Sequence, residues 1–343
     1  IMVYNKYIGI IGGTGTIGSI IVKYLLQLQT HFHVLIGGRR SIKEISMSTF
    51  YNSERLKYNQ MNYNNDVELD NFCSQCLLVI NAVGPSFKIN DKIALHALRN
   101  NCHYIDIGGY GILRDLLKPY EKSIEAQKLC FIIGVGWMPG ISGVFSKTII
   151  ETHLNSPENT NFNIYYGAVD NWSYSSTYDL AASSMGKTRS YVYSHGKEIQ
   201  VSPFRYTHHK FFPFIGHKKI CMPSFDEQLT QLATSLKQIR KISTFIMLND
   251  YISMGKFMFI KIFYKHNLNK ATLMLQDDYQ RLVKKENKWG SVICQVSKIE
   301  PERKIDTFYY LYTKNNLLYT ALPAVITLSL IHISEPTRHS LIS

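Results

Sequence analysis

The stretch YIGIIGGTGTIGSIIVKYLL, residues 7–26, decides the fold of this chain. It predicts an apolar strand at Tyr7–Ile11, a glycine-rich loop and an amphipathic helix at Ile17–Leu28. The loop fits both G-x-x-G-x-x-G and G-x-G-x-x-G, and the strand before it and the helix after it make the match specific. Glycines let backbone N–H groups approach a pyrophosphate closely, and a helix N-terminus is partly positive. We therefore expect a dinucleotide to bind at the loop residues, which are Gly12, Gly13, Thr14, Gly15, Thr16, Ile17 and Gly18.

The end of the next predicted strand, His33–Ile36, bears on which dinucleotide binds. A site for NAD usually places Asp or Glu there to bind the ribose 2′-hydroxyl. This chain has Gly37-Gly38-Arg39-Arg40 instead. Because guanidinium groups form charge-assisted hydrogen bonds with phosphate, we expect Arg39 and Arg40 to bind a 2′-phosphate and NADP(H) to be preferred over NAD(H). The alternative is a solvated turn, since charged residues are common at strand ends.

Short apolar runs alternate with helical patterns from residue 7 to residue 135, which predicts a Rossmann-type doubly wound parallel sheet within an α/β domain. Further strands are expected at Leu77–Val83, His103–Ile107 and Cys130–Val135, and helices at Asp91–Asn100 and Leu113–Lys128. The polar stretch Tyr51–Asp70 marks a third strand and its helix only poorly.

A turn follows the Leu77–Val83 strand, at the edge where open α/β sheets bind ligands. Small residues there let the backbone lie near a cofactor, although Gly-Pro is also a common turn. We expect the cofactor to be bordered by Asn81, Ala82, Val83, Gly84 and Pro85.

The pattern changes after Pro139-Gly140, where many strands with few crossover helices predict a second, α+β domain with a mostly antiparallel sheet. Its expected strands are Phe162–Val169, Thr188–Tyr193, Gln200–Pro203, Phe257–Phe263, Leu273–Leu275, Ser291–Val296 and Thr307–Tyr312, with a helix at Asp226–Ile239. The predicted divisions are an NADP-binding domain at 2–138, a substrate and dimerisation domain at 139–316, a truncated helix at 317–328 that returns to the first domain, and a non-native tail at 329–343. That tail resembles the translation of sequencing-adaptor DNA, so we expect the native C-terminus to be missing.

Composition excludes several classes of protein. The 343 residues are 45% hydrophobic and 18% charged, which is typical of a globular chain. The net charge of +13 is scattered along the chain and not gathered in basic clusters, so we expect a small-molecule substrate and no nucleic acid.

Six cysteines are too few for a disulfide scaffold, and the N-terminus lacks a signal pattern, so we expect free thiols and a cytoplasmic location. Cys73-x-x-Cys76 has no second pair, so no metal site is expected.

No hydrophobic run is long and uninterrupted enough for a transmembrane segment. Peripheral membrane contact is an alternative for the basic, Phe- and Met-rich run Met254–Lys265, which could lie on an anionic bilayer. The same run is also explained by a core-facing strand with lysines on its outer face, and we expect that arrangement.

Five segments together resemble the saccharopine dehydrogenase-like NAD(P)-binding oxidoreductase family. They are Gly12–Gly18, Val34–Arg39, Val79–Pro85, His103–Gly108 and Gly134–Gly140. The resemblance implies a homodimeric reductase with a Rossmann domain, a central α+β domain and a final helix that returns to the first domain. It implies hydride transfer at a carbon bonded to nitrogen, or at a related carbonyl or alkene carbon.

The sequence differs from the family's usual pattern at two positions. Tyr110 stands where members often have an acidic residue, and Ile141 follows Pro139-Gly140 where saccharopine-forming members tend to have Asp. Saccharopine is therefore not the expected substrate.

The proton donor is not singled out by the sequence. Asp106 ends a predicted strand near the cofactor, although it could instead bind backbone amides. A polar and aromatic cluster early in the second domain could line the substrate pocket or form an ordinary sheet edge. The catalytic candidates are Asp106, Tyr110, Asp170 and Tyr178. A non-catalytic NADP-binding or membrane-surface protein that retains the glycine loop is the alternative function.

Overall fold

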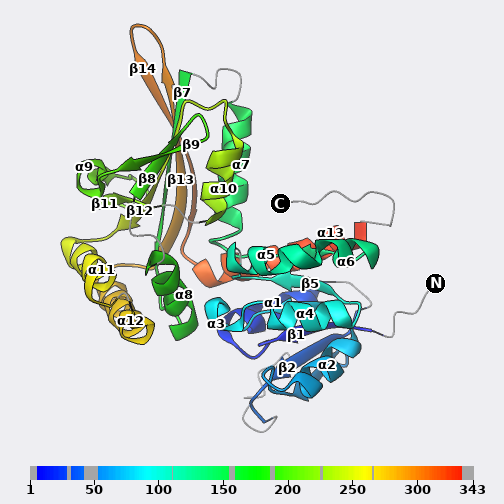
Figure 1. Ribbon diagram of the computed structural model, residues 1–343. Coiled ribbons are helices and arrows are strands. Elements are labelled where there is room, and N and C mark those ends of the chain that lie inside the picture. Colours follow the sequence, from blue (N-terminus) through cyan, green and yellow to red (C-terminus); the bar gives the residue numbers. More distant parts are fainter. Residues whose placement is uncertain are drawn as a thin grey trace. The chain divides into compact units, whose positions relative to one another are not determined.

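The computed structural model describes residues 6–28, 32–41, 53–109, 111–153, 159–185, 190–224, 227–264 and 266–333. The chain divides into two compact units (Figure 1). Unit 1 comprises Ile1–Gly140 and Leu317–Ser343, and unit 2 comprises Ile141–Asn316. The chain therefore leaves unit 1 once and returns to it. Within the described residues, no helix combines the length and apolar character that crossing a bilayer requires.

Unit 1 is built on a six-stranded parallel sheet with the order β3-β2-β1-β4-β5-β6. Its strands are β1 (Tyr7–Ile11), β2 (Val34–Gly38), β3 (Leu56–Gln60), β4 (Cys76–Asn81), β5 (His103–Asp106) and β6 (Phe131–Ile132). The strand order reverses between β1 and β4, which is the switch point where doubly wound sheets bind ligands. The predicted Rossmann-type sheet is confirmed.

Helices cover both faces of this sheet because successive strand residues point to opposite sides. Ile8 and Ile10 pack with α1 (Thr16–Gln27) and α13 (Asn316–Ile333) on one face. The other face packs against α2 (Asp66–Ser74), α4 (Lys92–Arg99) and α5 (Gly111–Leu117). The remaining helices are α3 (Ser86–Ile89), the short 3₁₀ helix η1 (Lys118–Tyr120) and α6 (Glu121–Ala126).

Two features of unit 1 differ from the expectation. The helix expected at Leu113–Lys128 is broken into α5, η1 and α6, because Pro119 cannot donate the backbone hydrogen bond that a continuous helix needs. The poorly marked third strand is β3, an edge strand whose side chains are partly exposed and therefore polar.

At the other end of the chain, α13 runs through Pro323 and continues to Ile333, while residues 334–343 of the predicted tail lie outside the described residues.

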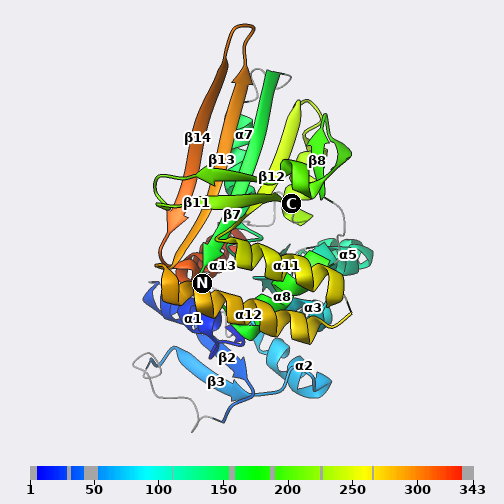
Figure 2. The same ribbon diagram turned by 90° about the vertical axis from the view of Figure 1, so that its left-hand side faces the viewer.

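Unit 2 is built on an eight-stranded sheet with the path β10-β11-β12-β7-β13-β14, and β8 joins β12 to β9 (Figure 2). Its strands are β7 (Thr160–Val169), β8 (Ser190–Ser194), β9 (Lys197–Val201), β10 (His208–Phe211), β11 (Lys218–Pro223), β12 (Lys241–Leu248), β13 (Trp289–Ile299) and β14 (Lys304–Thr313). β7 and β12 run parallel, and the other described pairings are antiparallel. The expected mostly antiparallel α+β architecture is confirmed.

The helices of unit 2 are α7 (Ile141–Thr152), α8 (Tyr174–Met185), α9 (Pro203–Tyr206), α10 (Glu227–Ser235), α11 (Tyr251–Phe263) and α12 (Leu268–Lys285). Both views show α11 and α12 side by side (Figures 1 and 2). The unit has its own apolar core, in which Tyr165, Phe245 and Trp289 of the sheet pack with Leu282 of α12.

Two predicted strands of unit 2 are wrong. Phe257–Phe263 lies in α11 and Leu273–Leu275 lies in α12, so the core-facing strand expected within Met254–Lys265 is a helix as far as Phe263. Nearly every residue of FMFIKIF is apolar, and such a run fits a buried strand as well as a helix. A third predicted strand, Gln200–Pro203, is displaced, since β9 ends at Val201 and α9 begins at Pro203.

Candidate cofactor-binding site

The predicted cofactor residues lie in loops that follow neighbouring strands of unit 1. The glycine loop follows β1, the arginines follow β2, and the Asn81–Pro85 turn begins at the last residue of β4. Asp106 is the last residue of β5. Because these strands are parallel and adjacent, all four segments lie at the carboxyl edge of one sheet.

The glycine loop is packed so closely that side chains would not fit at two of its positions. Gly12 has a φ of +83°, which L side chains rarely adopt, and an added Cβ would lie 2.9 Å from Val83 Cγ2. At Gly18, an added Cβ would collide with the carbonyl oxygen of Gly12. The loop therefore requires glycine to bring the turn after β4 and the first turn of α1 together.

The N-terminus of α1 has the character of an anion site. Gly15 is its N-cap residue, so no side chain caps the helix, and its first turn contains no acidic residue. The first N–H groups of an α-helix lack partners within the helix, and they carry a partial positive charge. An uncapped N-terminus after a loop that excludes side chains fits the pyrophosphate of a dinucleotide.

The two arginines after β2 have different surroundings. The Arg40 guanidinium donates a hydrogen bond to the carbonyl oxygen of Thr14 at 2.7 Å, and thereby ties the β2 loop to the glycine loop. Within the described part of the chain, no hydrogen bond or ion pair engages the exposed Arg39 guanidinium. Arg39 is therefore available to an anion, while Arg40 already holds the loop that the anion would contact.

Asp106 and Asn81 form a buried polar network beneath the loops. Both side chains are 2% exposed, and Asn81 Nδ2 donates to Asp106 Oδ2 at 2.8 Å. The same carboxylate oxygen accepts from the Tyr104 hydroxyl at 2.7 Å. The other oxygen, Oδ1, accepts from the backbone N–H groups of Gly108 at 2.9 Å and Gly109 at 2.6 Å.

Four donors thus converge on the Asp106 carboxylate. Burial, and then the neighbouring carboxylate, raise the pKa of the Tyr104 hydroxyl well above its ordinary value, so that Tyr104 remains a donor at neutral pH. Asn81 uses its own Oδ1 to accept from Val83 N–H at 3.0 Å, which shapes the turn after β4. The contacts of Asp106 are therefore those of a residue that orders two loops, as in the alternative in which it binds backbone amides.

The remaining catalytic candidates are not part of this network. Tyr110 lies outside the described residues. Asp170 and Tyr178 belong to unit 2, where both are buried. The Asp170 carboxylate binds Lys288 Nζ at 2.8 Å and Asn316 Nδ2 at 3.1 Å, so its charge is compensated. Their roles in catalysis stay predictions.

Two residues that shape the site carry no motif in the sequence. The Tyr58 hydroxyl of β3 lies within hydrogen-bonding distance of the carbonyl oxygens of Gly38 and Arg40. Gln60 Nε2 donates to the carbonyl oxygen of Arg39 at 3.4 Å. The period-two alternation of β3 places Tyr58 and Gln60 on one face, but the polar stretch Tyr51–Asp70 marks this strand too poorly to fix its register.

The Cys73 and Cys76 thiols lie in the core of unit 1, where Cys102 joins them. Cys102 Sγ lies 3.1 Å from the carbonyl oxygen of Cys73 and 3.2 Å from that of Cys76. Burial raises the pKa of the Cys102 thiol to about 11 and raises those of the other two further. All three are therefore protonated core thiols at neutral pH.

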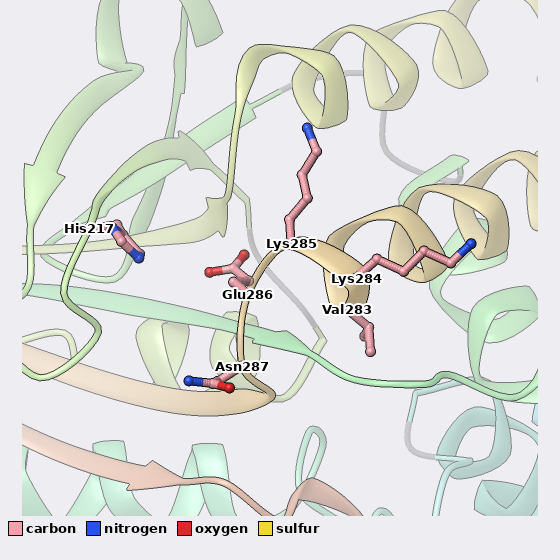
Figure 3. Close-up of a pocket in the computed structure, with 6 residues that line it drawn as sticks. All are labelled: His217, Val283, Lys284, Lys285, Glu286 and Asn287. Carbon is pink, nitrogen blue, oxygen red and sulfur yellow. The ribbon is translucent and has the colours of Figure 1, made fainter.

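A hollow with a cavity volume of about 350 Å³ lies in unit 2, at the end of α12 (Figure 3). It is lined by His217, Val283, Lys284, Lys285, Glu286 and Asn287. None of these is a predicted site residue. The Glu286 carboxylate is already paired with the buried Lys219 ammonium, with Oε2 and Nζ 3.1 Å apart, so the hollow does not present an uncompensated acid.

Comparison with known proteins agrees with this geometry. Residues 8–130 match the family model of the saccharopine dehydrogenase NADP binding domain. Among curated proteins, none matches the sequence. Apo saccharopine dehydrogenase (L-Glu forming) from Saccharomyces cerevisiae has a similar solved structure, with 12% identity, a TM-score of 0.66, and coverage of 97% of this chain and 92% of that chain.

Two further solved structures are more distant, each with a TM-score of 0.49. A probable dehydrogenase from Thermotoga maritima is 10% identical and is matched over 97% of this chain and 91% of that one. An engineered D-amino acid dehydrogenase is 11% identical, over 98% and 92% of the two chains. The yeast structure supports the fold, and the family model identifies the domain that contains the glycine loop, the arginines and the Asn81–Asp106 network. Residues 8–130 therefore belong to the saccharopine dehydrogenase NADP-binding domain family, which supports an NAD(P)-dependent oxidoreductase, and the chain as a whole shares the fold of the yeast enzyme.

Proposed function

We propose that the protein is an NADPH-dependent reductase that transfers hydride to or from a carbon bonded to nitrogen, or a related carbonyl or alkene carbon, in a small metabolite. The observation that carries the preference for NADPH is the exposed guanidinium of Arg39 just after β2, which no described residue engages by a hydrogen bond or ion pair, at a place where a carboxylate would select NADH. The bound nicotinamide would supply the hydride in the reduction and accept it in the reverse direction.

In this proposal, the residues of unit 1 bind and orient the cofactor. The N–H groups at the start of α1 bind the pyrophosphate, and Arg39 binds the 2′-phosphate. Asn81 and Asp106 hold the turns after β4 and β5, which would border the nicotinamide. The proton donor is proposed to come from the remaining candidates, Tyr110, Asp170 or Tyr178.

The direct test is titration of the purified protein with NADPH and NADH, followed by cofactor oxidation with a panel of imines and 2-oxo acids. We expect saturable NADPH binding and turnover with at least one member of the panel. Gly15→Asp should abolish binding, because a carboxylate would then face the phosphates at the helix N-terminus. Val67→Asp, which places the same charge on an exposed position of α2, is the matched control. Absence of saturable binding by the unchanged protein would refute the proposal.

We further propose that the protein is a cytoplasmic homodimer. The six cysteines are free thiols, which supports a reducing compartment. Light scattering coupled to size-exclusion chromatography measures the mass in solution, and a monomer would contradict the dimer.

A further inference from the structure

Helix α11 presents an unusually apolar face to solvent. We call the α11 apolar face the set Ile252, Gly255, Phe259, Ile262 and Phe263. Ile262 and Phe263 are 64% and 67% exposed, Ile252 is 50% exposed, and a Cβ added at Gly255 would meet no atom within 4 Å. At 3.6 residues per turn these positions fall within an arc of about 120° on one side of the helix.

The opposite side of α11 is anchored in unit 2, so its exposed face is held in place. Ser253, Phe257 and Ile260 are buried at helical spacing. The Asp250 carboxylate caps the helix by accepting from Ser253 N–H at 2.8 Å, and also binds the Arg281 guanidinium of α12. The apolar face is therefore a fixed surface and not a frayed segment.

The charges beside this face are mainly positive. α11 and α12 together contain six Lys and Arg residues but only two Asp residues. Lys256 compensates Asp277 and Asp278, at 2.7 Å and 3.4 Å. The Lys261 ammonium lies over the ring of the buried Phe257, 5.0 Å from its centroid, on the anchored side of α11. Within the described chain, no ion pair engages the exposed Lys270, Lys284 or Lys285 of the neighbouring helix α12. An apolar helix face flanked by uncompensated basic residues is the pattern of helices that lie in the interface of anionic membranes.

We propose that the α11 apolar face is a peripheral membrane-docking surface, which inserts Ile252, Phe259, Ile262 and Phe263 among the lipids of an anionic bilayer while neighbouring lysines contact phosphate groups. The surface adds to the oxidoreductase activity of unit 1 and does not replace it. A second copy of this chain fits the surface less well, because two such faces would bring basic residues together without acidic partners.

Co-sedimentation with vesicles tests the proposal. We expect the protein to bind vesicles of phosphatidylcholine and phosphatidylserine much more tightly than vesicles of phosphatidylcholine alone, and to be released by salt. Ile262→Glu and Phe263→Glu should each lower the partition coefficient at least about tenfold, because they place a carboxylate in the inserted face. Both positions are exposed, so the far-UV circular dichroism and the thermal midpoint should remain those of the unchanged protein.

Val67→Glu is the matched control, because it adds the same charge at an equally exposed apolar position in unit 1. It should bind vesicles like the unchanged protein. As a second readout, Phe263→Trp should show a blue-shifted tryptophan emission with anionic vesicles, whereas Val67→Trp should not.

Three results would overturn the proposal. The first is no binding of the unchanged protein to anionic vesicles, and the second is an equal loss for Val67→Glu and Phe263→Glu. The third is dissociation of a dimer by Phe263→Glu with vesicle binding unchanged, which would assign the face to a second copy of the chain.

Discussion

Arg39 and Arg40 are adjacent in the sequence but engage different partners. Arg40 donates to the Thr14 carbonyl oxygen, whereas no described hydrogen bond or ion pair holds the Arg39 guanidinium. The sequence predicts a pair of guanidiniums near the 2′ position. It could not divide their roles, because the carbonyl oxygen that binds Arg40 is brought there by a loop 26 residues away.

Because Arg39 and Arg40 have different partners, their substitutions should change cofactor affinity differently. Arg39→Ala should raise the Kd for NADPH by about tenfold or more and leave the Kd for NADH nearly unchanged, because only NADPH has the phosphate that Arg39 would bind. Arg40→Ala should weaken both cofactors, because it frees the glycine loop. Nicotinamide fluorescence titrations measure all four constants. If Arg39→Ala lowered the affinity for NADPH and for NADH equally, Arg39 would not be the residue that selects NADPH.

Asp106 is a second residue whose role follows from its partners. Asp106→Asn replaces one acceptor oxygen by a donor and sets it against groups that already donate, which should cost about 2–3 kcal/mol. We expect the thermal midpoint and the NADPH affinity to fall together. Tyr104→Phe removes one of the four donors and should cause a smaller loss, of about 1 kcal/mol. If Asp106 were the proton donor instead, Asp106→Asn would abolish kcat with the thermal midpoint and the affinity intact.

At the scale of elements, the sequence predicted best where apolar residues had a clear period or a clear boundary. The runs at β1, β4 and β5 are bounded by glycine or by polar residues, and they are buried strands as expected. The α11 run lacks such a signal, because its apolar residues surround the helix. The helix is anchored by burial of Ser253, Phe257 and Ile260, and Asp250 at its N-cap also binds Arg281 of another helix. Such tertiary contacts are not visible in a local pattern.

The capping contacts of Asp250 predict a local stability effect. Asp250→Ala removes the N-cap of α11 and leaves Arg281 with Asp278 and the Ser253 hydroxyl, and it should cost about 1–2 kcal/mol. Chemical denaturation followed by circular dichroism measures the change. Asp277→Ala, which removes an exposed acid from the neighbouring helix, is the comparison and should cost less than about 1 kcal/mol. Equal costs for the two substitutions would contradict a capping role.

The same carboxylate predicts a dependence of stability on pH. Burial alone would raise the pKa of Asp250, but hydrogen bonds from Arg281 and Ser253 outweigh burial and lower it from 3.8 to about 2. A lowered folded-state pKa contributes stability that is fully present above about pH 4 and is lost as the pH falls through 2. The difference in stability between the unchanged protein and Asp250→Asn should therefore shrink over this window. A difference that stays constant from pH 5 to about 2 would exclude this linkage.

At the scale of the whole molecule, unit 1 is completed by a segment from the far end of the sequence. Helix α13 places Ala321, Ala324, Val325 and Leu328 in the same core as the strands of the parallel sheet and α1. Its Tyr319 ring packs edge-on against Trp137, with ring centroids 5.7 Å apart. Periodicity indicates an apolar helix near residue 320 but not its destination, since an apolar helix can cover any sheet. Only the resemblance to a family implied that it returns to the first domain.

A core that includes α13 predicts that cofactor binding depends on residues more than 300 positions from the glycine loop. Ala324 is fully buried, so Ala324→Asp would bury an unpaired carboxylate against the sheet and should destabilise unit 1 by about 3–5 kcal/mol. NADPH affinity should be lost with it, although Ala324 lies on no predicted cofactor loop. Ile326→Asp adds the same charge to the 62% exposed side of the same helix and should preserve both stability and binding. Thermal unfolding and NADPH titration of the two variants compare them directly, and similar behaviour would show that α13 does not support the cofactor-binding sheet.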